Sequence, residues 1–119
     1  MDDSLPPVRD AEHLDALLAD THDVPLLLFK HSQSCGTSFE ALDELLAHQA
    51  GGADNVRYAM VTVQQDRGLS QAIASRFNVR HETPQVLLVR GGHVVWTASH
   101  FGINGRALDQ ALAMPVPAT

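Results

Sequence analysis

The chain has 119 residues, 45% of them hydrophobic, which is typical of one compact globular domain rather than of a disordered chain. Its formal net charge of -6 at pH 7 argues against non-specific binding to nucleic acid or to anionic lipid. No apolar stretch reaches the ~18 residues that span a bilayer, and the acidic N-terminus lacks the features of a secretory signal, so we expect a cytoplasmic protein without a membrane partner.

The first part of the chain predicts a loose tail, a helix and a buried strand. The tail covers residues 1–7, and the helix covers residues 8–19, where apolar side chains recur at helical spacing. The apolar run Leu26–Phe29 is unbroken, as expected for a strand that is covered on both faces of a sheet. Pro25 must lie at the beginning of this strand, because proline has no N–H to donate to a neighbouring strand.

The remaining elements alternate between helices and strands. In chain order they are a helix from Phe39 to Gly51–Gly52, a strand over residues 56–63, a helix over residues 69–77, strands over residues 86–89 and 94–98, a helix over residues 104–113 and a loose tail over residues 114–119. A helix joins the first two strands, so these two should run parallel. Gly91–Gly92 predicts a tight turn between the last two strands, which should therefore run antiparallel.

This order of elements resembles the thioredoxin-like plan. We therefore expect an α/β fold with a mixed four-stranded sheet, flanked by helices and preceded by an extra N-terminal helix, as a single domain over residues 1–119. Pro84 stands directly before a strand, which is unusual unless it has a special role such as a cis turn. In thioredoxin-like folds a cis proline at this place faces the active cysteine, so the resemblance implies a cis bond between Thr83 and Pro84. The alternative is an ordinary trans proline that opens an edge strand.

Cys35 is the only cysteine of the chain and lies where the first buried strand gives way to a helix. Backbone N–H groups at a helix start are unpaired, and together with the helix dipole they stabilise a thiolate. The neighbours of Cys35 are polar and favour an accessible position: Ser32, Gln33, Ser34, Gly36, Thr37 and Ser38. A reactive thiol is one interpretation, and a small buried hydrophobic side chain is the other. One cysteine cannot form an intramolecular disulfide, which agrees with a reducing cytoplasm.

Four blocks of sequence, spread over residues 29–103, carry a resemblance to a known family. They are Lys30-His31-Ser32 with Ser34-Cys35, Val63–Arg67 with Leu69-Ser70, Phe77–Leu88, and Val95–Ile103. These blocks resemble the monothiol bacilliredoxins, the redox proteins of the bacillithiol system. Where that family usually carries a proline and a hydrophobic residue after the cysteine, this chain has Gly36 and Thr37. This difference affects the rigidity of the turn that follows Cys35, but Cys35 and Ser38 themselves match the family pattern.

The resemblance implies a thiol–disulfide oxidoreductase that removes bacillithiol from mixed disulfides on cytoplasmic proteins. Cys35 would be the nucleophile, and bacillithiol would be a co-substrate rather than a bound cofactor. Ser38 stands where a dithiol enzyme has its resolving cysteine, so an external low-molecular-weight thiol would complete the cycle. The main chain at Thr83, opposite Cys35, would pair with the substrate, as thioredoxin-like sites generally do. The implied partners are bacillithiolated proteins and the small thiol, with neither nucleic acid nor a membrane.

Ser38 and His31 are the two side chains expected to support the thiolate. Ser38 would donate a hydrogen bond to the sulfur, or alternatively would satisfy local backbone groups in the first helical turn. His31 would form an ion pair with the thiolate, or alternatively would be turned away at the strand end, and Lys30 has the same two orientations. A zinc site needs about four converging ligands. One cysteine with dispersed histidines does not supply them, so we expect no metal.

Two other classes of function stay open. Cys35-Gly36-Thr37-Ser38 differs at one residue from the Cys-Gly-Phe-Ser pattern of monothiol glutaredoxins, which use glutathione to bridge an iron–sulfur cluster between two subunits. The tryptophan-proline-threonine and glycine-glycine-cysteine blocks of those glutaredoxins are absent from this sequence. The chain could alternatively be a binding module that keeps the fold without catalysis.

Overall fold

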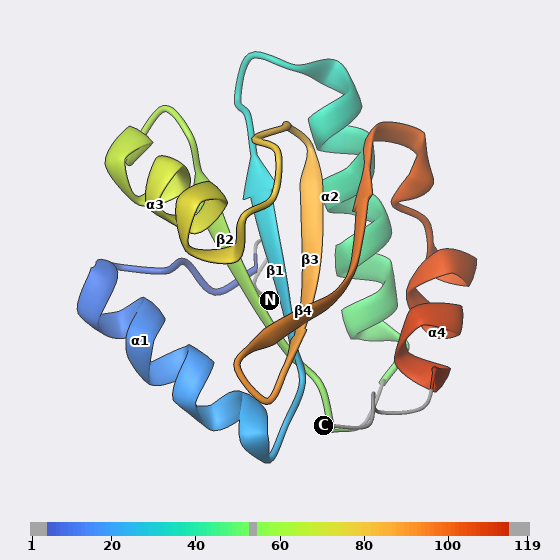
Figure 1. Cartoon of the computed structure of the whole chain (residues 1–119). Coiled ribbons are helices and arrows are strands. Elements are labelled where there is room, and N and C mark those ends of the chain that lie inside the picture. Colours follow the sequence, from blue (N-terminus) through green and yellow to red (C-terminus); the bar gives the residue numbers. More distant parts are fainter. Residues whose placement is uncertain (1–4, 53–54, 115–119) are drawn as a thin grey trace.

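Two pairs of helices cover the two faces of one mixed β-sheet in the computed structural model, which describes residues 5–52 and 55–114 (Figure 1). The α-helices, short 3-10 helices (η) and strands are, in chain order, α1 (Ala11–Ala19), η1 (Asp20–His22), β1 (Leu26–His31), α2 (Gly36–Ala50), β2 (Arg57–Thr62), α3 (Arg67–Phe77), β3 (Gln85–Arg90), β4 (His93–Ser99), η2 (His100–Gly102) and α4 (Gly105–Ala113). The rest of the two predicted tails, residues 1–4 and 115–119, lies outside the described residues.

The sheet formed by the described residues has the strand order β2-β1-β3-β4. β1 runs parallel to β2 and antiparallel to β3, and β3 runs antiparallel to β4. The parallel pair is joined by α2, and the last antiparallel pair is joined by a tight turn, as the order of elements predicted. The predicted mixed four-stranded sheet, its flanking helices and the extra N-terminal helix are therefore confirmed.

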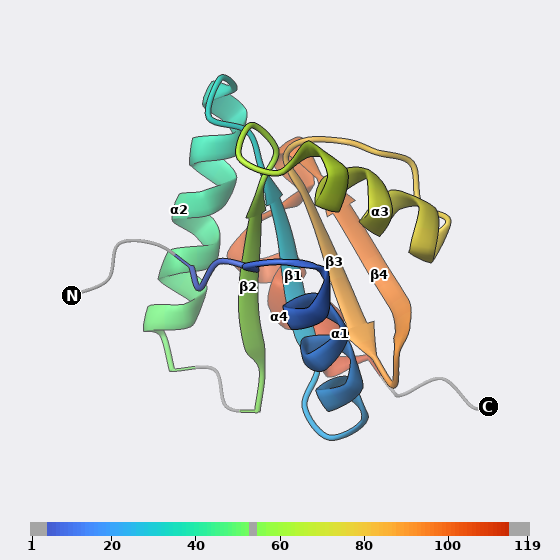
Figure 2. The same cartoon turned by 90° about the vertical axis from the view of Figure 1, so that its left-hand side faces the viewer.

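β1 lies inside the sheet and is buried on both faces, which explains its apolar run. Leu27 and Phe29 belong to the core beneath α2 and α4, whereas Leu26 and Leu28 belong to the core beneath α1 and α3. Figures 1 and 2 show these two helical layers on opposite sides of the sheet. Among residues 5–52 and 55–114, no helix has both the length and the apolar character needed to cross a membrane.

α1 begins later than the sequence pattern predicted. Asp10, whose backbone is extended, caps the helix, and its side chain accepts the His13 N–H at 2.7 Å. Aspartate is a preferred residue at this position because its oxygen satisfies one of the unpaired N–H groups at the helix start. The expected range 8–19 therefore shortens to Ala11–Ala19, and Val8 lies outside the helix.

The described part of the segment before α1 is not a loose tail. Leu5 is completely buried in the core beneath α2 and α4. Met60 of β2 donates its N–H to the Pro6 carbonyl at 2.8 Å and accepts the Val8 N–H at 2.9 Å. The prediction of a loose tail is therefore wrong for residues 5–7, because backbone pairing with β2 and apolar burial hold them in place.

Gly91 and Gly92 form the tight turn expected between β3 and β4. Their φ angles are 58° and 80°, in the left-handed region that glycine adopts without strain. Both N–H groups donate to Thr21, one to its carbonyl and one to its Oγ1, each at 2.8 Å. The turn is thus tied to the segment that leads into β1.

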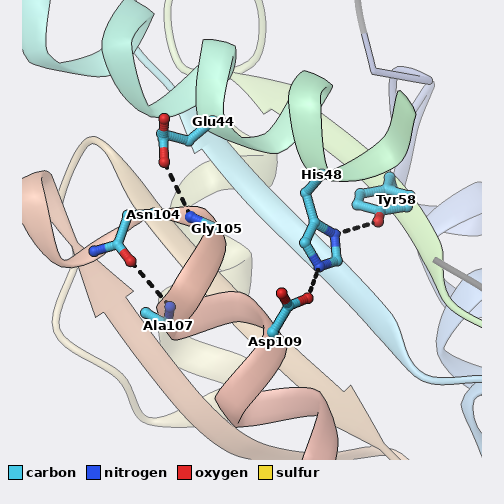
Figure 3. A network of polar contacts seen from close by, with 7 residues as sticks. All are labelled: Glu44, His48, Tyr58, Asn104, Gly105, Ala107 and Asp109. Atoms are coloured by element: carbon cyan, nitrogen blue, oxygen red, sulfur yellow. Dashed lines mark hydrogen bonds and ion pairs between the residues drawn. The ribbon is translucent and has the colours of Figure 1, made fainter. Parts of the chain in front are cut away.

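A polar network joins α2, β2 and α4 near the last turn of α2 (Figure 3). Nδ1 of His48 lies 2.5 Å from the Tyr58 hydroxyl, and Nε2 lies 2.8 Å from an Asp109 carboxylate oxygen. Burial and the Asp109 carboxylate raise the pKa of Tyr58 to about 12, so the phenol stays protonated. At the start of α4, the Gly105 N–H donates to Glu44 of α2 at 3.0 Å. These contacts fix α4 against α2, whose opposite end carries the cysteine.

Candidate active site

Cys35 is the N-cap residue of α2, at the edge of the sheet where β1 ends. Its backbone is extended, with φ -121° and ψ 117°, and its side chain makes no capping hydrogen bond. The residue is half-buried and its thiol forms no disulfide. The first turn of α2, where N–H groups are left without helical partners, therefore begins directly after a half-buried cysteine. The sequence predicted both this position and the partial exposure.

Thr83 and Pro84 lie at the same edge of the sheet. Lys30, near the end of β1, pairs with Gln85, the first residue of β3, so the segment after β1 meets the segment before β3. The bond between Thr83 and Pro84 is cis, as predicted. The Pro84 carbonyl accepts the His100 N–H at 3.2 Å, which ties η2 to this edge as well. Figure 1 shows the connections before α2, before β3 and after β4 gathered at the upper edge of the sheet.

Ser38 occupies the first turn of α2 and is fully buried. Its Oγ accepts the Ser32 N–H at 2.9 Å and lies 2.7 Å from Nδ1 of His31. Ser38 therefore satisfies a local backbone group, which is the second of the two roles considered from the sequence. Within the described residues its hydroxyl makes no hydrogen bond to the sulfur of Cys35, so support of the thiolate by Ser38 stays a prediction.

His31 points into the layer between the sheet and α2. The residue is 4% exposed, and its ring meets Phe39 edge-on with centroids 4.8 Å apart. Burial lowers the pKa of His31, so the neutral imidazole is favoured at neutral pH. Its ring lies on the α2 side of the sheet, against Ser38 and Phe39 of the first turn of α2. An ion pair between His31 and the thiolate stays a prediction.

Replacing Ser38 with alanine should destabilise the protein by about 1–3 kcal/mol, because the buried Ser32 N–H and the His31 ring would lose their partner. The matched control is Ser34→Ala. Ser34 is exposed, and within the described residues its side chain hydrogen-bonds only to the Ser32 hydroxyl and the Gln64 side chain, so a change below about 0.5 kcal/mol is expected. Urea unfolding measures both variants. Equal effects would show that the buried contacts of Ser38 add nothing to stability.

Thr37 lies on the side of α2 that faces η2, where a groove of about 200 Å³ separates the two elements. The other residues that line this groove are Glu40, Ala41, Glu44, His100, Phe101, Ile103 and Asn104. Phe101 is 77% exposed beside it. Gly36, by contrast, is exposed, and a Cβ added there would meet no atom within 4 Å. Nothing in its surroundings therefore requires a glycine at this position.

Gly36→Pro should stabilise the protein by about 0.4–1 kcal/mol, because proline restricts the unfolded chain and suits the first residue of a helix. The extended backbone of Cys35 is the conformation that residues before proline prefer. Gly105→Pro is the matched control. Gly105 is also the first residue of a helix with open space around it, but its N–H donates to Glu44, so proline there should destabilise. Thermal unfolding compares the two; a lower melting temperature for Gly36→Pro would contradict the prediction.

A side chain from the loop after β2 holds the loop that leads into Cys35. Oε1 of Gln64 accepts the Gln33 N–H at 3.0 Å, and its Nε2 donates to Ser32 Oγ at 2.9 Å and to Ser34 Oγ at 3.2 Å. In the sequence, Gln64 is only part of a family-like block without an assigned role. The sequence did contain a signal for this contact. Gln64 is a polar residue that closely follows β2, and the carboxyl ends of parallel strands such as β1 and β2 lie at the same edge of a sheet.

Lys30 faces the side of the sheet opposite to His31, toward α1 and α3, because side chains alternate along β1. It is fully buried, and within the described residues its Nζ has no hydrogen-bond partner. Burial lowers the pKa of Lys30 to about 8, and the nearby Glu82 carboxylate partly counteracts this effect. Of the two orientations expected for Lys30, the structure therefore shows the one turned away from the thiol.

Comparison with known proteins agrees with this fold. Residues 7–108 match the family described as Monothiol bacilliredoxin BrxC. A solved protein described as having a thioredoxin fold is 28% identical, with 92% of this chain and 94% of that chain covered and a TM-score of 0.82. Two thioredoxins share the fold. The one from Fasciola hepatica is 19% identical, with 91% of this chain and 96% of that chain covered and a TM-score of 0.71. A mutant thioredoxin from Halobacterium salinarum is 23% identical, with 97% of this chain and 96% of that chain covered and a TM-score of 0.70. Because the family match covers most of its length, this chain belongs to the monothiol bacilliredoxin family.

Proposed function

We propose that this protein removes bacillithiol from mixed disulfides on cytoplasmic proteins, as a monothiol thiol–disulfide oxidoreductase. The observation that carries the proposal is the half-buried Cys35 at the amino end of α2, the place in the fold where thioredoxin-like proteins carry their reactive cysteine. Membership of the monothiol bacilliredoxin family supports bacillithiol as the small thiol. The chain holds a single cysteine, so it has no second thiol with which to run a dithiol cycle.

The chemistry is an exchange between sulfur atoms in two steps. The Cys35 thiolate attacks the bacillithiol sulfur of the mixed disulfide; a disulfide forms between Cys35 and bacillithiol, the original S–S bond breaks, and the target cysteine leaves as a thiolate that takes a proton from water. The thiolate of a second bacillithiol then attacks the bacillithiol sulfur bound to Cys35. This step releases bacillithiol disulfide and regenerates the Cys35 thiolate. Bacillithiol is therefore a co-substrate, and the cycle needs no bound cofactor.

The target protein would dock at the edge where Thr83 and Pro84 meet the start of α2. Thr83 is half-buried there, and its main chain would pair with an amide of the substrate. Gly36 and Thr37 form the first turn of α2 beside the thiol and would face the incoming disulfide. This edge also carries η2, which is held to the Pro84 carbonyl through the His100 N–H.

The test is the recovery of free thiol on a model protein capped with bacillithiol, with a glutathione-capped version as the control. We expect faster release of the bacillithiol cap, and mass spectrometry should find the bacillithiol adduct on Cys35. Equal rates on both caps would remove the basis for naming bacillithiol but retain thiol exchange. No release from either cap would contradict an enzymatic role and favour a binding module. A brown protein after anaerobic reconstitution with iron and sulfide would favour a cluster carrier instead.

A further inference from the structure

We propose that Gln64 is a positioning residue for Cys35: it holds the loop over residues 32–34 so that the cysteine stays at the amino end of α2. This inference deepens the proposed function, because it rests on Cys35 being the thiol that reacts. Gln64 itself need not touch the substrate. It acts through the hydrogen bonds that fix the loop in front of the cysteine.

Ser32 is the centre of this loop, and each of its polar groups is used. Its N–H donates to Ser38 Oγ at 2.9 Å, and its carbonyl accepts the Cys35 N–H at 3.4 Å. Its Oγ accepts a hydrogen bond from Nε2 of Gln64 at 2.9 Å. The backbone of Cys35 is therefore placed by Ser32. Ser32 in turn is held by Ser38 from within α2 and by Gln64 from outside it.

Within the described residues, Gln64 is the only side chain from outside residues 31–38 that hydrogen-bonds to this loop. Both ends of its amide are engaged, because Oε1 accepts the Gln33 N–H while Nε2 donates to two hydroxyls. The sheet brings Gln64 here. β1 and β2 are parallel with His31 opposite Thr62, so the residues that follow each strand leave the sheet at one edge. Figure 2 shows the connections after β1 and after β2 side by side.

These contacts act on the placement of the thiol more than on the stability of the fold. Gln64 is exposed, and hydrogen bonds at an exposed position compete with water and add little to the free energy of unfolding. Without them, Gln33 and Ser34 would lose their tie to the loop after β2. Cys35 would then be held less firmly at the amino end of α2, and its sulfur would lie less often where an incoming disulfide can reach it. A misplacement of a reacting atom by about 1 Å can lower a rate up to about 100-fold.

The experiment compares Gln64→Ala with Gln65→Ala. Gln65 is the next residue and is also exposed, but its side chain makes no hydrogen bond in the part of the chain that the structure describes. We measure the rate at which Cys35 attacks dipyridyl disulfide, an uncharged small disulfide that requires neither bacillithiol nor a target protein. We expect Gln64→Ala to react about tenfold more slowly. Gln65→Ala should react at the wild-type rate, and both variants should unfold at the same urea concentration. Equal rates for the two variants would overturn the proposal.

The backbone amide of Gln33 provides a second readout, because Gln64 is the only partner of its N–H among the residues that the structure describes. Gln64→Met keeps the length of the side chain but removes its amide. In this variant and in Gln64→Ala the Gln33 amide should exchange faster with solvent by NMR, whereas in Gln65→Ala it should not change. Unchanged exchange of the Gln33 amide in the two Gln64 variants would overturn the proposal. A reaction rate with dipyridyl disulfide that falls only in proportion to the lost free energy of unfolding would assign Gln64 a structural role and would also overturn it. A tenfold effect on dipyridyl disulfide without any release of bacillithiol would contradict the proposed function and leave the role of Gln64 standing.

Discussion

Cys35→Ser should reduce the release of bacillithiol from a capped protein to the uncatalysed rate. With Cys35 replaced, no sulfur nucleophile remains in the chain to accept the transferred thiol. The fold should be retained, because Cys35 makes no side-chain capping bond and serine is among the preferred residues at the start of a helix. The release rate and the urea unfolding midpoint are measured on the same preparation.

Two results separate loss of chemistry from loss of fold. Gln65→Ala keeps the sulfur and removes an exposed side chain that makes no hydrogen bond within the described residues, so it should retain the activity. If Cys35→Ser unfolded at lower urea than the wild type, its inactivity would say nothing about chemistry, and Cys35→Ala would replace it in the assay. If a folded Cys35→Ser variant retained wild-type rates, transfer would not pass through Cys35 and the proposed mechanism would be wrong.

Lys30→Met should stabilise the protein by about 1–3 kcal/mol at pH 7. The Lys30 ammonium is fully buried without a hydrogen-bond partner among the described residues, and methionine has a similar shape without the charge. Burial lowers the pKa of Lys30 from 10.5 to about 8, while attraction to Glu82 offsets part of this cost. Urea unfolding measures the gain. Arg67→Met is the control, because Arg67 is exposed and a change within about 0.5 kcal/mol is expected there.

The gain from Lys30→Met should depend on pH with a definite sign. The pKa of Lys30 is lower in the folded than in the unfolded chain, so between about pH 8 and pH 10.5 the unfolded chain binds more protons. Wild-type stability should therefore rise with pH across this window, and the advantage of Lys30→Met should shrink. Below pH 8 both states are protonated and the advantage should be constant. A gain without pH dependence would assign the effect to packing, and a loss at pH 7 would show that the ammonium stabilises the fold.

The parts of this fold that the sequence predicted are those decided by neighbouring residues. The unbroken run Leu26–Phe29 requires cover on both faces, so it had to be an inner strand. The polar residues after it had to leave the sheet and enter a helix, which placed Cys35 at a helix start. Gly91–Gly92 has a backbone preference that holds whatever lies elsewhere in the chain. The cis bond before Pro84, by contrast, was implied by the resemblance to thioredoxin-like folds and not by the local sequence.

These local patterns did not predict contacts between segments that are far apart in the sequence. β1 continues past Phe29 through Lys30 and His31, but a charged side chain is rarely buried, so the apolar run marked its end too early. The orientation of His31 depended on which face of the sheet α2 covers. Gln64 hydrogen-bonds to Ser32, a contact that exists only because β1 and β2 pair in parallel.

The segment before α1 also affects how the protein behaves toward other copies of itself. β2 is at an edge of the sheet, and an open edge offers unpaired N–H and carbonyl groups to which another chain can add as a strand. Pro6 and Val8 occupy the outward-facing backbone groups of Met60. Pro6 and Pro7 have no N–H, so the covering segment offers few donors to an incoming strand. Residues 5–8 thus cover the edge of β2 at Met60, and an added strand could not pair there without displacing them.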